Sequence, residues 1–403
     1  MEMPEINRRK FLIASAGVGA LGLSGAAAFT LPHLMDAAQD RPLAANTGIL
    51  VIVTLYGGND GVSTVIPYTD GAYYDARADL AYQPSEVIDL DGSVGLNPAL
   101  TGLASSWRDR SLAIVRGVGY PNQDRSHFRS MDIWQTASPA EPASTGWIGR
   151  WLDATGDDPL RAVNLGVVVP PLAMGEKSVA ATLSDAIPLV SPDFGRVLTA
   201  LRDDDPNDTA AMRGVRASYR ANARTTAAFR PLASSTQPAA VQPGDVNVLK
   251  MQLDLVAKCV KAGVPTQVYM VSLGGFDTHA DERGTQQQLL QKVDDALTPF
   301  LQAMRTNVHG KDLVVMMYSE FGRRVAANAS EGTDHGTSGP VFVMGRPVKG
   351  GFYGDEPSLT DLTGGDLKTT TDFRDVYAEL LTRTVGTDPG PSVGESRRSI
   401  GFL

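Results

Sequence analysis

The sequence lacks the features on which several common classes of protein depend. Its 403 residues include one cysteine, Cys259, so no disulfide can form within the chain and no cysteine-based zinc pattern is present. Cys259 lies on an apolar helical pattern and is predicted to be a buried small hydrophobe. The net charge of −9 at pH 7 indicates no basic surface, so no nucleic acid is expected as a partner. Neither a Walker loop nor a Gly-x-Ser-x-Gly elbow occurs.

Residues 1–30 are predicted to be a twin-arginine signal peptide. Asn7-Arg8-Arg9-Lys10-Phe11-Leu12 has the form of the twin-arginine core, and a Gly- and Ala-rich apolar run extends to Leu23. The run is too short to persist as a membrane span, and its modest hydrophobicity favours the twin-arginine route. The sequence therefore predicts export of the folded chain by the twin-arginine translocation machinery to the periplasm or the extracellular space, with no permanent membrane span after cleavage. Retention as an uncleaved anchor and a chance Arg-Arg pair before a buried helix are the alternatives.

Residues 45–403 are predicted to form a single α/β domain. Apolar runs rich in β-branched residues alternate with helical patterns such as Gln288 to Met304 and Asp372 to Val385. Runs of this kind suit strands covered on both faces, so we expect a mainly parallel central sheet with helices on both sides. The Asp-, Pro- and Ser-containing segment near 203–244 is predicted to be an insertion. The predicted strands are Ile49–Leu55, Ser111–Val115, Thr266–Leu273, Leu313–Tyr318 and Val341–Met344.

Carboxylates and imidazoles follow or precede these strands. In open α/β sheets, ligands bind beyond the carboxyl ends of the strands, and histidine nitrogens with carboxylate oxygens are ligands for divalent cations. Each of these segments is also compatible with an ordinary turn or a capped surface loop. The candidate metal ligands are Asp60, Asp277, His279, Glu320, Asp334 and His335.

A further chemical element begins a helical pattern that runs to about Gln135. Ser126 would cap that helix, or it would be a nucleophile at the positive end of the helix dipole. The adjacent His127 is a candidate ligand, base or structural residue. Arg125 or Arg323 would hold an anionic group. Arg324 is a further candidate for binding an anionic ester. Alternatively, Arg323 and Arg324 only pair with Glu320 and surface acids.

These motifs together resemble an exported bacterial family known as domain of unknown function 1501, from about Leu50 to the C-terminus. The family is uncharacterised, and it is thought to be related to the alkaline phosphatase and sulfatase superfamily. The resemblance implies an alkaline-phosphatase-like α/β sandwich with one or two metal ions. The motifs that carry it are Gly57 to Gly61, Ser126 to Gln135, Gly274 to His279, Ser319 to Arg323 and Thr333 to Gly336.

The order of the motifs agrees with the superfamily except at one nitrogen ligand. The resemblance implies an acidic ligand at Asp60, a nucleophile at Ser126, and an Asp and a His from one strand end at Asp277 and His279. An adjacent Asp-His pair and a last His should follow. The chain offers Glu320-Phe321 and then His335, or Asp334-His335 with no later histidine. Either alignment loses one nitrogen, which favours one metal or an oxygen-rich site that would suit Zn, Mn, Mg or Ca.

The sequence thus predicts an exported, metal-dependent hydrolase of phosphate or sulfate esters. The metal would activate Ser126 or a water molecule, and the substrate would be a small anionic ester. The alternative is a catalytically inactive exported binding or assembly protein on the same fold, which the missing nitrogen ligand motivates.

Overall fold

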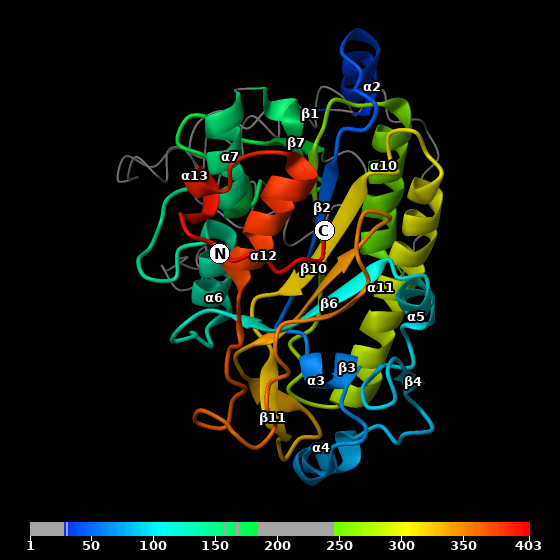
Figure 1. Cartoon of the computed structure of the whole chain (residues 1–403), viewed down its shortest axis with the longest axis vertical. Coiled ribbons are helices and arrows are strands. Elements are labelled where there is room, and N and C mark those ends of the chain that lie inside the picture. The colour runs from blue at the N-terminus through cyan, green and yellow to red at the C-terminus, as the bar shows by residue number, and fades with distance from the viewer. Residues whose placement is uncertain (1–27, 30, 157, 167–168, 184–245) are drawn as a thin grey trace, which may run out of the picture.

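A computed structural model describes residues 28–29, 31–156, 158–166, 169–183 and 246–403 of the chain (Figure 1). Nearly all of the predicted signal peptide and the whole predicted insertion near 203–244 lie outside the described residues. None of the helices in these described ranges has the length and apolar character needed to cross a membrane.

A ten-stranded sheet forms the centre of the described chain. All pairs from one edge to β10 are parallel, β13 is antiparallel to both of its neighbours, and β14 and β15 pair with β6 in parallel. The prediction of a mainly parallel sheet is therefore confirmed. In sheet order the strands are β1 (Ala28–Phe29), β8 (Ala181–Leu183), β7 (Ala162–Asn164), β9 (Val268–Gly274), β2 (Ile49–Tyr56), β10 (Leu313–Ser319), β13 (Gly339–Met344), β6 (Leu112–Gly119) and β14 (Gly351–Tyr353), with β15 (Thr371–Asp372) also on β6.

Helices cover both faces of the sheet, as predicted (Figure 1). Alternate residues of β2 show why: Ile49, Val51 and Val53 belong to one buried cluster, whereas Leu50 and Ile52 belong to the other. A strand buried on both faces has no polar side, which is the pattern that the apolar runs indicate. One face carries α2 (Leu31–Asp40), α5 (Thr101–Arg108), α10 (Val248–Ala262) and α11 (Glu282–Arg305), and the other carries α6 (His127–Thr136), α7 (Trp147–Thr155), α12 (Phe373–Leu380) and α13 (Gly390–Val393).

Short elements gather beyond the carboxyl ends of β2, β9 and β10, in the lower part of Figure 1. An antiparallel pair, β11 (Arg323–Ala327) and β12 (Thr333–His335), follows β10, and Arg323 lies directly opposite His335. Helices α3 (Gly61–Thr64) and α4 (Gly71–Arg77) follow β2, with the small sheet of β3 (Val65–Ile66), β5 (Gly95–Leu96) and β4 (Ile88–Asp89). The loops after β2, β9 and β10 therefore converge, and they carry the predicted site residues.

Candidate metal centre

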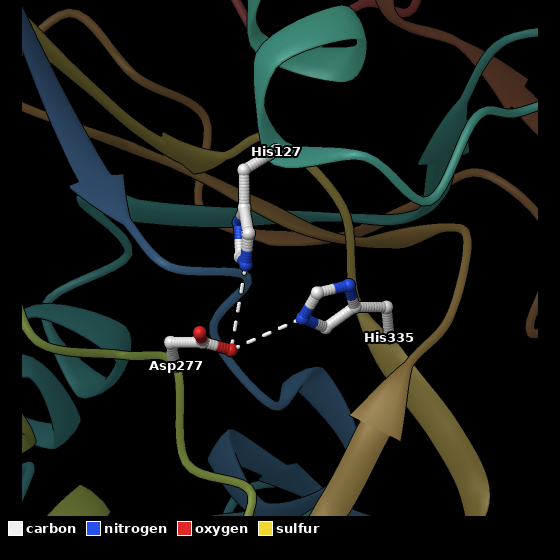
Figure 2. Close-up of side chains that lie close together, drawn as sticks. All are labelled: His127, Asp277 and His335. Atoms are coloured by element: carbon white, nitrogen blue, oxygen red, sulfur yellow. Dashed lines mark hydrogen bonds and ion pairs between the residues drawn. The ribbon is translucent and has the colours of Figure 1, made fainter. Parts of the chain in front are cut away.

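Three imidazoles converge on one carboxylate oxygen at this edge of the sheet. The Oδ1 atom of Asp277 lies 3.4 Å from Nε2 of His127, 3.0 Å from Nε2 of His279 and 3.1 Å from Nε2 of His335. The Nε2 atoms of His279 and His335 are 2.9 Å apart. Figure 2 shows the rings of His127 and His335 approaching Asp277 from different directions. We call these four residues the His-Asp centre.

Three segments supply the four residues of this centre, and a fourth packs against it. Asp277 and His279 lie two residues apart in the loop after β9, behind a bend at Gly275, whose positive φ of +107° favours glycine. His335 is the last residue of β12, and His127 is the first residue of α6. The loop after β10 contributes buried Phe321, whose ring lies against the imidazoles of His127 and His335 with centroids 4.8 and 4.9 Å away.

The outer ring nitrogen of each histidine faces a hydrogen-bond acceptor. Nδ1 of His127 lies 2.9 Å from Oε1 of Glu320, and Nδ1 of His335 lies 2.8 Å from the carbonyl oxygen of Arg125. Nδ1 of His279 lies 3.5 Å from Oδ1 of Asp334. An acceptor at Nδ1 places the ring proton there and leaves a lone pair on Nε2 in the neutral imidazole. Histidines that bind metals are held by partners of this kind.

The electrostatics of the centre favour an ionised carboxylate. Burial alone would raise the pKa of Asp277, but the hydrogen bond from Arg323 and the contact with the imidazole of His335 lower it to about 2. Burial lowers the pKa of His127, but the hydrogen bond and charge of Glu320 outweigh it, so the pKa is raised above 6.5. For His335, burial is the largest effect, and its pKa is lowered. At neutral pH His335 therefore offers a free lone pair beside an anionic oxygen.

This donor set fits a single divalent metal ion. One ligand atom each from His127, Asp277 and His335 lies within 4.8 Å of the other two, and Nε2 of His127 is buried with no hydrogen-bond partner among the residues that the structure describes. Ligands of one tetrahedral zinc ion lie about 3.3 Å from each other, given bonds of about 2.0–2.1 Å. Four of the six pairs of ligand atoms in the His-Asp centre lie 2.9 to 3.4 Å apart, close to this value. Nitrogen-rich sets of this kind suit zinc better than magnesium or calcium.

Two predicted ligands lie one step outside the centre. Glu320 is buried, and its Oε1 accepts from the backbone N–H of Gly57 and faces His127, while its Oε2 accepts from Ser319. Asp334 is exposed, faces His279 and accepts from Asn328. Both carboxylates therefore orient imidazoles, and the structure does not bring them among the converging atoms.

Arg323 does not occupy the anion-binding position that the sequence suggested. Its side chain is fully buried, and it donates to the carbonyl oxygens of Gly57, Gly58, Phe276 and Thr333 as well as to Asp277 at 2.7 Å. Every guanidinium nitrogen has a partner, so none faces a substrate. Arg323 instead joins the loops after β2 and β9 to β12 and holds Asp277 in place.

Asp60 also lies outside the His-Asp centre. Its carboxylate is fully buried, and both oxygens accept from the guanidinium of buried Arg77, with Oδ1 at 2.9 Å from Nη2. Oδ1 also caps α3 through the N–H of Val62. Burial opposes ionisation, but Arg77 lowers the pKa of Asp60 to about 2. The structure therefore places the predicted ligand Asp60 apart from the converging imidazoles, with both of its oxygens bound by Arg77. Nothing in the sequence pattern indicated Arg77, which lies on α4, or Glu282, the buried carboxylate 4.0 Å from it.

Ser126 lies at the N-cap of α6, next to His127, as predicted. Its side chain is exposed and makes no capping hydrogen bond, so the structure does not show the capping role that the sequence offered as one alternative. The buried Ser130 in the same helix is bound by Tyr120 and by the carbonyl oxygen of Glu320, which fixes α6 against the loop after β10. Ser126 therefore offers an exposed hydroxyl one residue before His127 of the His-Asp centre.

Several solved structures are similar to this chain. A protein in the alkaline phosphatase superfamily from Vibrio parahaemolyticus is 9% identical with a TM-score of 0.42, covering 94% of this chain and 79% of that one. The lipoteichoic acid synthase LtaP from Listeria monocytogenes is 11% identical with a TM-score of 0.40, covering 91% and 80%. The phosphonate monoester hydrolase SpPMH from Silicibacter pomeroyi is 10% identical with a TM-score of 0.40, covering 88% and 76%. No curated protein matches the chain in sequence.

One family model matches the second half of the sequence. It is described as "Protein of unknown function (DUF1501)" and matches residues 195–395. The matched range contains the motifs of Asp277, Glu320 and His335, whereas those around Asp60 and His127 precede it. The resemblance predicted from the motifs is confirmed: over residues 195–395 this chain is similar to the DUF1501 family.

Proposed function

We propose that this chain is a metal-dependent hydrolase of phosphate or sulfate esters. The observation that carries the proposal is the His-Asp centre, where three Nε2 atoms lie within 3.4 Å of one carboxylate oxygen. Acceptors at each Nδ1 leave the inner lone pairs facing one another. The lone pairs on these nitrogens and on the carboxylate oxygen repel one another unless a cation or protons lie between them.

His127, Asp277 and His335 would hold the ion, and His279 is the candidate fourth ligand. A divalent cation there would act as a Lewis acid and neutralise the negative charge that develops on an ester in the transition state. Arg323 keeps Asp277 ionised and fixed, so the carboxylate does not have to reorient when substrate binds.

Ser126 is the candidate nucleophile. It stands at the N-terminus of the ten-residue helix α6, where free N–H groups and the helix dipole favour negative charge on oxygen. Its N–H donates to Asp124 at 2.7 Å, which fixes the backbone while the hydroxyl remains free. A water molecule in place of Ser126 is the alternative nucleophile.

The inactive binding or assembly protein was motivated by a missing nitrogen ligand. His127 changes that count, because its Nε2 lies 3.4 Å from Asp277 and supplies a third imidazole from a helix rather than from a strand end. The centre then has the three nitrogen donors and one oxygen donor that a zinc ion can use. This observation favours the hydrolase.

Metal content and turnover test the proposal together. The purified chain would be stripped with chelator and reloaded separately with Zn, Mn, Mg and Ca, and bound metal and hydrolysis of nitrophenyl phosphate and nitrophenyl sulfate would be measured. We expect one ion per chain, lost in His127→Ala and His335→Ala but retained in His309→Ala, which removes an imidazole elsewhere. Ser126→Ala should keep the metal and lose turnover; full turnover in that variant would make water the nucleophile. Metal content unchanged in His127→Ala and His335→Ala would refute the centre.

We also propose that the chain is exported by the twin-arginine route to the periplasm or the extracellular space. The support is the sequence Asn7 to Leu12 with the apolar run behind it. Replacing Arg8 and Arg9 together by Lys should retain the chain in the cytoplasm, as measured by fractionation. Normal export of that variant would exclude this route.

A further inference from the structure

Two arginines beside the His-Asp centre share one buried carboxylate. Arg125 Nη2 forms an ion pair with Oδ2 of Asp366, and Arg324 Nε lies 3.6 Å from Oδ1 of the same residue. The side chain of Asp366 is 1% exposed, whereas those of Arg125 and Arg324 are 42% and 36% exposed. The acid is therefore beneath the surface, and the two guanidinium groups reach solvent above it.

Both arginines are attached to the centre through their own backbones. The carbonyl oxygen of Arg125 accepts from Nδ1 of His335 at 2.8 Å. Arg324 directly follows Arg323, which donates to Asp277 at 2.7 Å. The pair thus borders the His-Asp centre along two separate segments, the approach to α6 and strand β11.

A glycine turn lies against both guanidinium groups. Gly364 and Gly365 have positive φ angles of +61° and +89°, and a Cβ atom on them would lie 3.8 Å from Nη2 of Arg125 and 3.5 Å from Nη1 of Arg324. Arg324 Nη2 also donates to the carbonyl oxygen of Gly364 at 3.3 Å. The turn and Asp366 together fix where the two side chains lie.

Arg125 and Arg324 together carry more positive charge and more N–H donors than the single carboxylate of Asp366 can pair with. One carboxylate faces two guanidinium groups, so one positive charge remains uncompensated within this cluster. Among the described residues, Nε and Nη1 of Arg125 and Nη1 of Arg324 have no hydrogen-bond partner assigned. Partly exposed guanidinium forks with spare N–H groups match the oxygens of a phosphate or sulfate.

We propose that Arg125 and Arg324 bind the tetrahedral oxyanion group of the substrate, with Asp366 as the residue that positions them. The proposal rests on the proposed hydrolase function and specifies which residues recognise the anion. Asp366 holds two long side chains in place before binding, which lowers the entropy cost of ordering them around the anion. It also assigns to Arg324 the role that buried Arg323 cannot fill.

We call Arg125, Arg324 and Asp366 the clamp. Measuring anion binding separately from turnover tests it. Inorganic phosphate and, separately, inorganic sulfate would be titrated calorimetrically into the full chain, once with its metal and once after chelation. Arg125→Gln and Arg324→Gln should each weaken binding about tenfold or more, because each removes charge-assisted hydrogen bonds. Arg129→Gln is the matched control, since Arg129 lies on α6 and pairs with Asp132 instead. Arg125→Lys should restore part of the affinity.

The outcomes separate this inference from the proposed function. Arginine-dependent anion binding in a chain without turnover would support the clamp and count against the hydrolase. Turnover with a KM unchanged in Arg125→Gln and Arg324→Gln would overturn the clamp and leave the hydrolase standing. For Asp366→Asn we expect a raised KM with little change in kcat and an unchanged metal content. Equal losses of affinity in Arg129→Gln and the two clamp variants would also overturn the clamp.

Discussion

Glu282 should make the free energy of unfolding of this chain fall as the pH rises, and Glu282→Gln should remove that dependence. Three charged side chains, Asp60, Arg77 and Glu282, are buried together at 0 to 1% exposure. Both oxygens of Asp60 accept from the guanidinium of Arg77. Oε1 of Glu282 lies 4.0 Å from Arg77 and has no hydrogen-bond partner within the described part of the chain. One buried cation cannot neutralise two carboxylates, so the less well paired acid should keep its proton.

The pKa of Glu282 gives the size of the effect. Burial and then the charge of Asp60 raise it from 4.5 to about 9. Because the folded-state pKa is raised, this contribution to stability is fully present below about pH 4.5 and is lost as the pH rises towards 9. Between these limits the folded chain holds one proton that the unfolded chain has released. The free energy of unfolding should therefore fall steadily with pH, by about 3 kcal/mol from about pH 6 to about pH 8.

Glu282→Gln keeps the shape and neutrality of the protonated acid without the ability to ionise. Its amide oxygen can still accept the hydrogen bond that Thr333 donates to Oε2 of Glu282. Relative to the parent chain, the variant should gain about 3 kcal/mol of stability over this range. Urea unfolding in excess chelator at about pH 6, 7 and 8 would measure this difference.

Two comparison variants make the result specific. Glu331→Gln removes the same charge from an exposed neighbour and should leave the pH dependence of the parent chain unchanged. Asp60→Asn removes the charge that raises the pKa and frees Arg77 to pair with Glu282, so it should also flatten the profile. A difference between Glu282→Gln and the parent that stays constant from about pH 6 to about pH 8 would refute the reasoning.

Other contacts give further predictions. Arg323→Met should cost about 3–5 kcal/mol in urea unfolding, because it leaves buried acceptors unpaired; a cost below about 1 kcal/mol would contradict the bracing role. Glu320→Gln should weaken zinc binding about 10- to 100-fold in competition titrations, because Glu320 orients His127 and keeps its Nδ1 protonated; unchanged affinity would separate His127 from the ion. Glu379→Ala should expose the C-terminal residues 399–403 to limited proteolysis, since buried Glu379 accepts three backbone N–H groups there; unchanged protection would show that packing alone holds them.

The sequence was most informative where local pattern determines the structure. Apolar runs placed β2, β9 and β10 within one or two residues of their bounds, because strands buried on both faces need continuous apolar residues. Strand β13 is antiparallel to its neighbours, which the same pattern could not reveal, since an apolar run has no direction. Asp277, His279 and His335 come together because loops at one edge of a sheet converge.

The remaining parts of the site depend on tertiary partners that no local pattern indicates. The sequence offers ligand, base or structural residue as roles for His127, and only the packing of α6 against Glu320 and Phe321 places its Nε2 at the centre. Arg323 was a candidate for binding an anion because it follows a strand, yet its carbonyl partners lie in loops that become neighbours only on folding. A residue type at a strand end therefore predicts a location better than a role.

The two aspartates that follow the central strands show how one residue type can have opposite uses. Asp60, after β2, is fully buried, and the guanidinium of Arg77 neutralises its charge by donating to both carboxylate oxygens. Asp277, after β9, receives Arg323 on Oδ1 alone, remains 48% exposed, and faces three imidazole nitrogens. Arg77 on both oxygens and the N–H of Val62 on Oδ1 already satisfy the charge and most of the hydrogen bonding of Asp60, whereas Asp277 faces imidazole nitrogens whose lone pairs a cation would bind. The arginine paired with Asp60 and the one nitrogen-rich centre found among the described residues, at Asp277, support our proposal of one metal ion per chain.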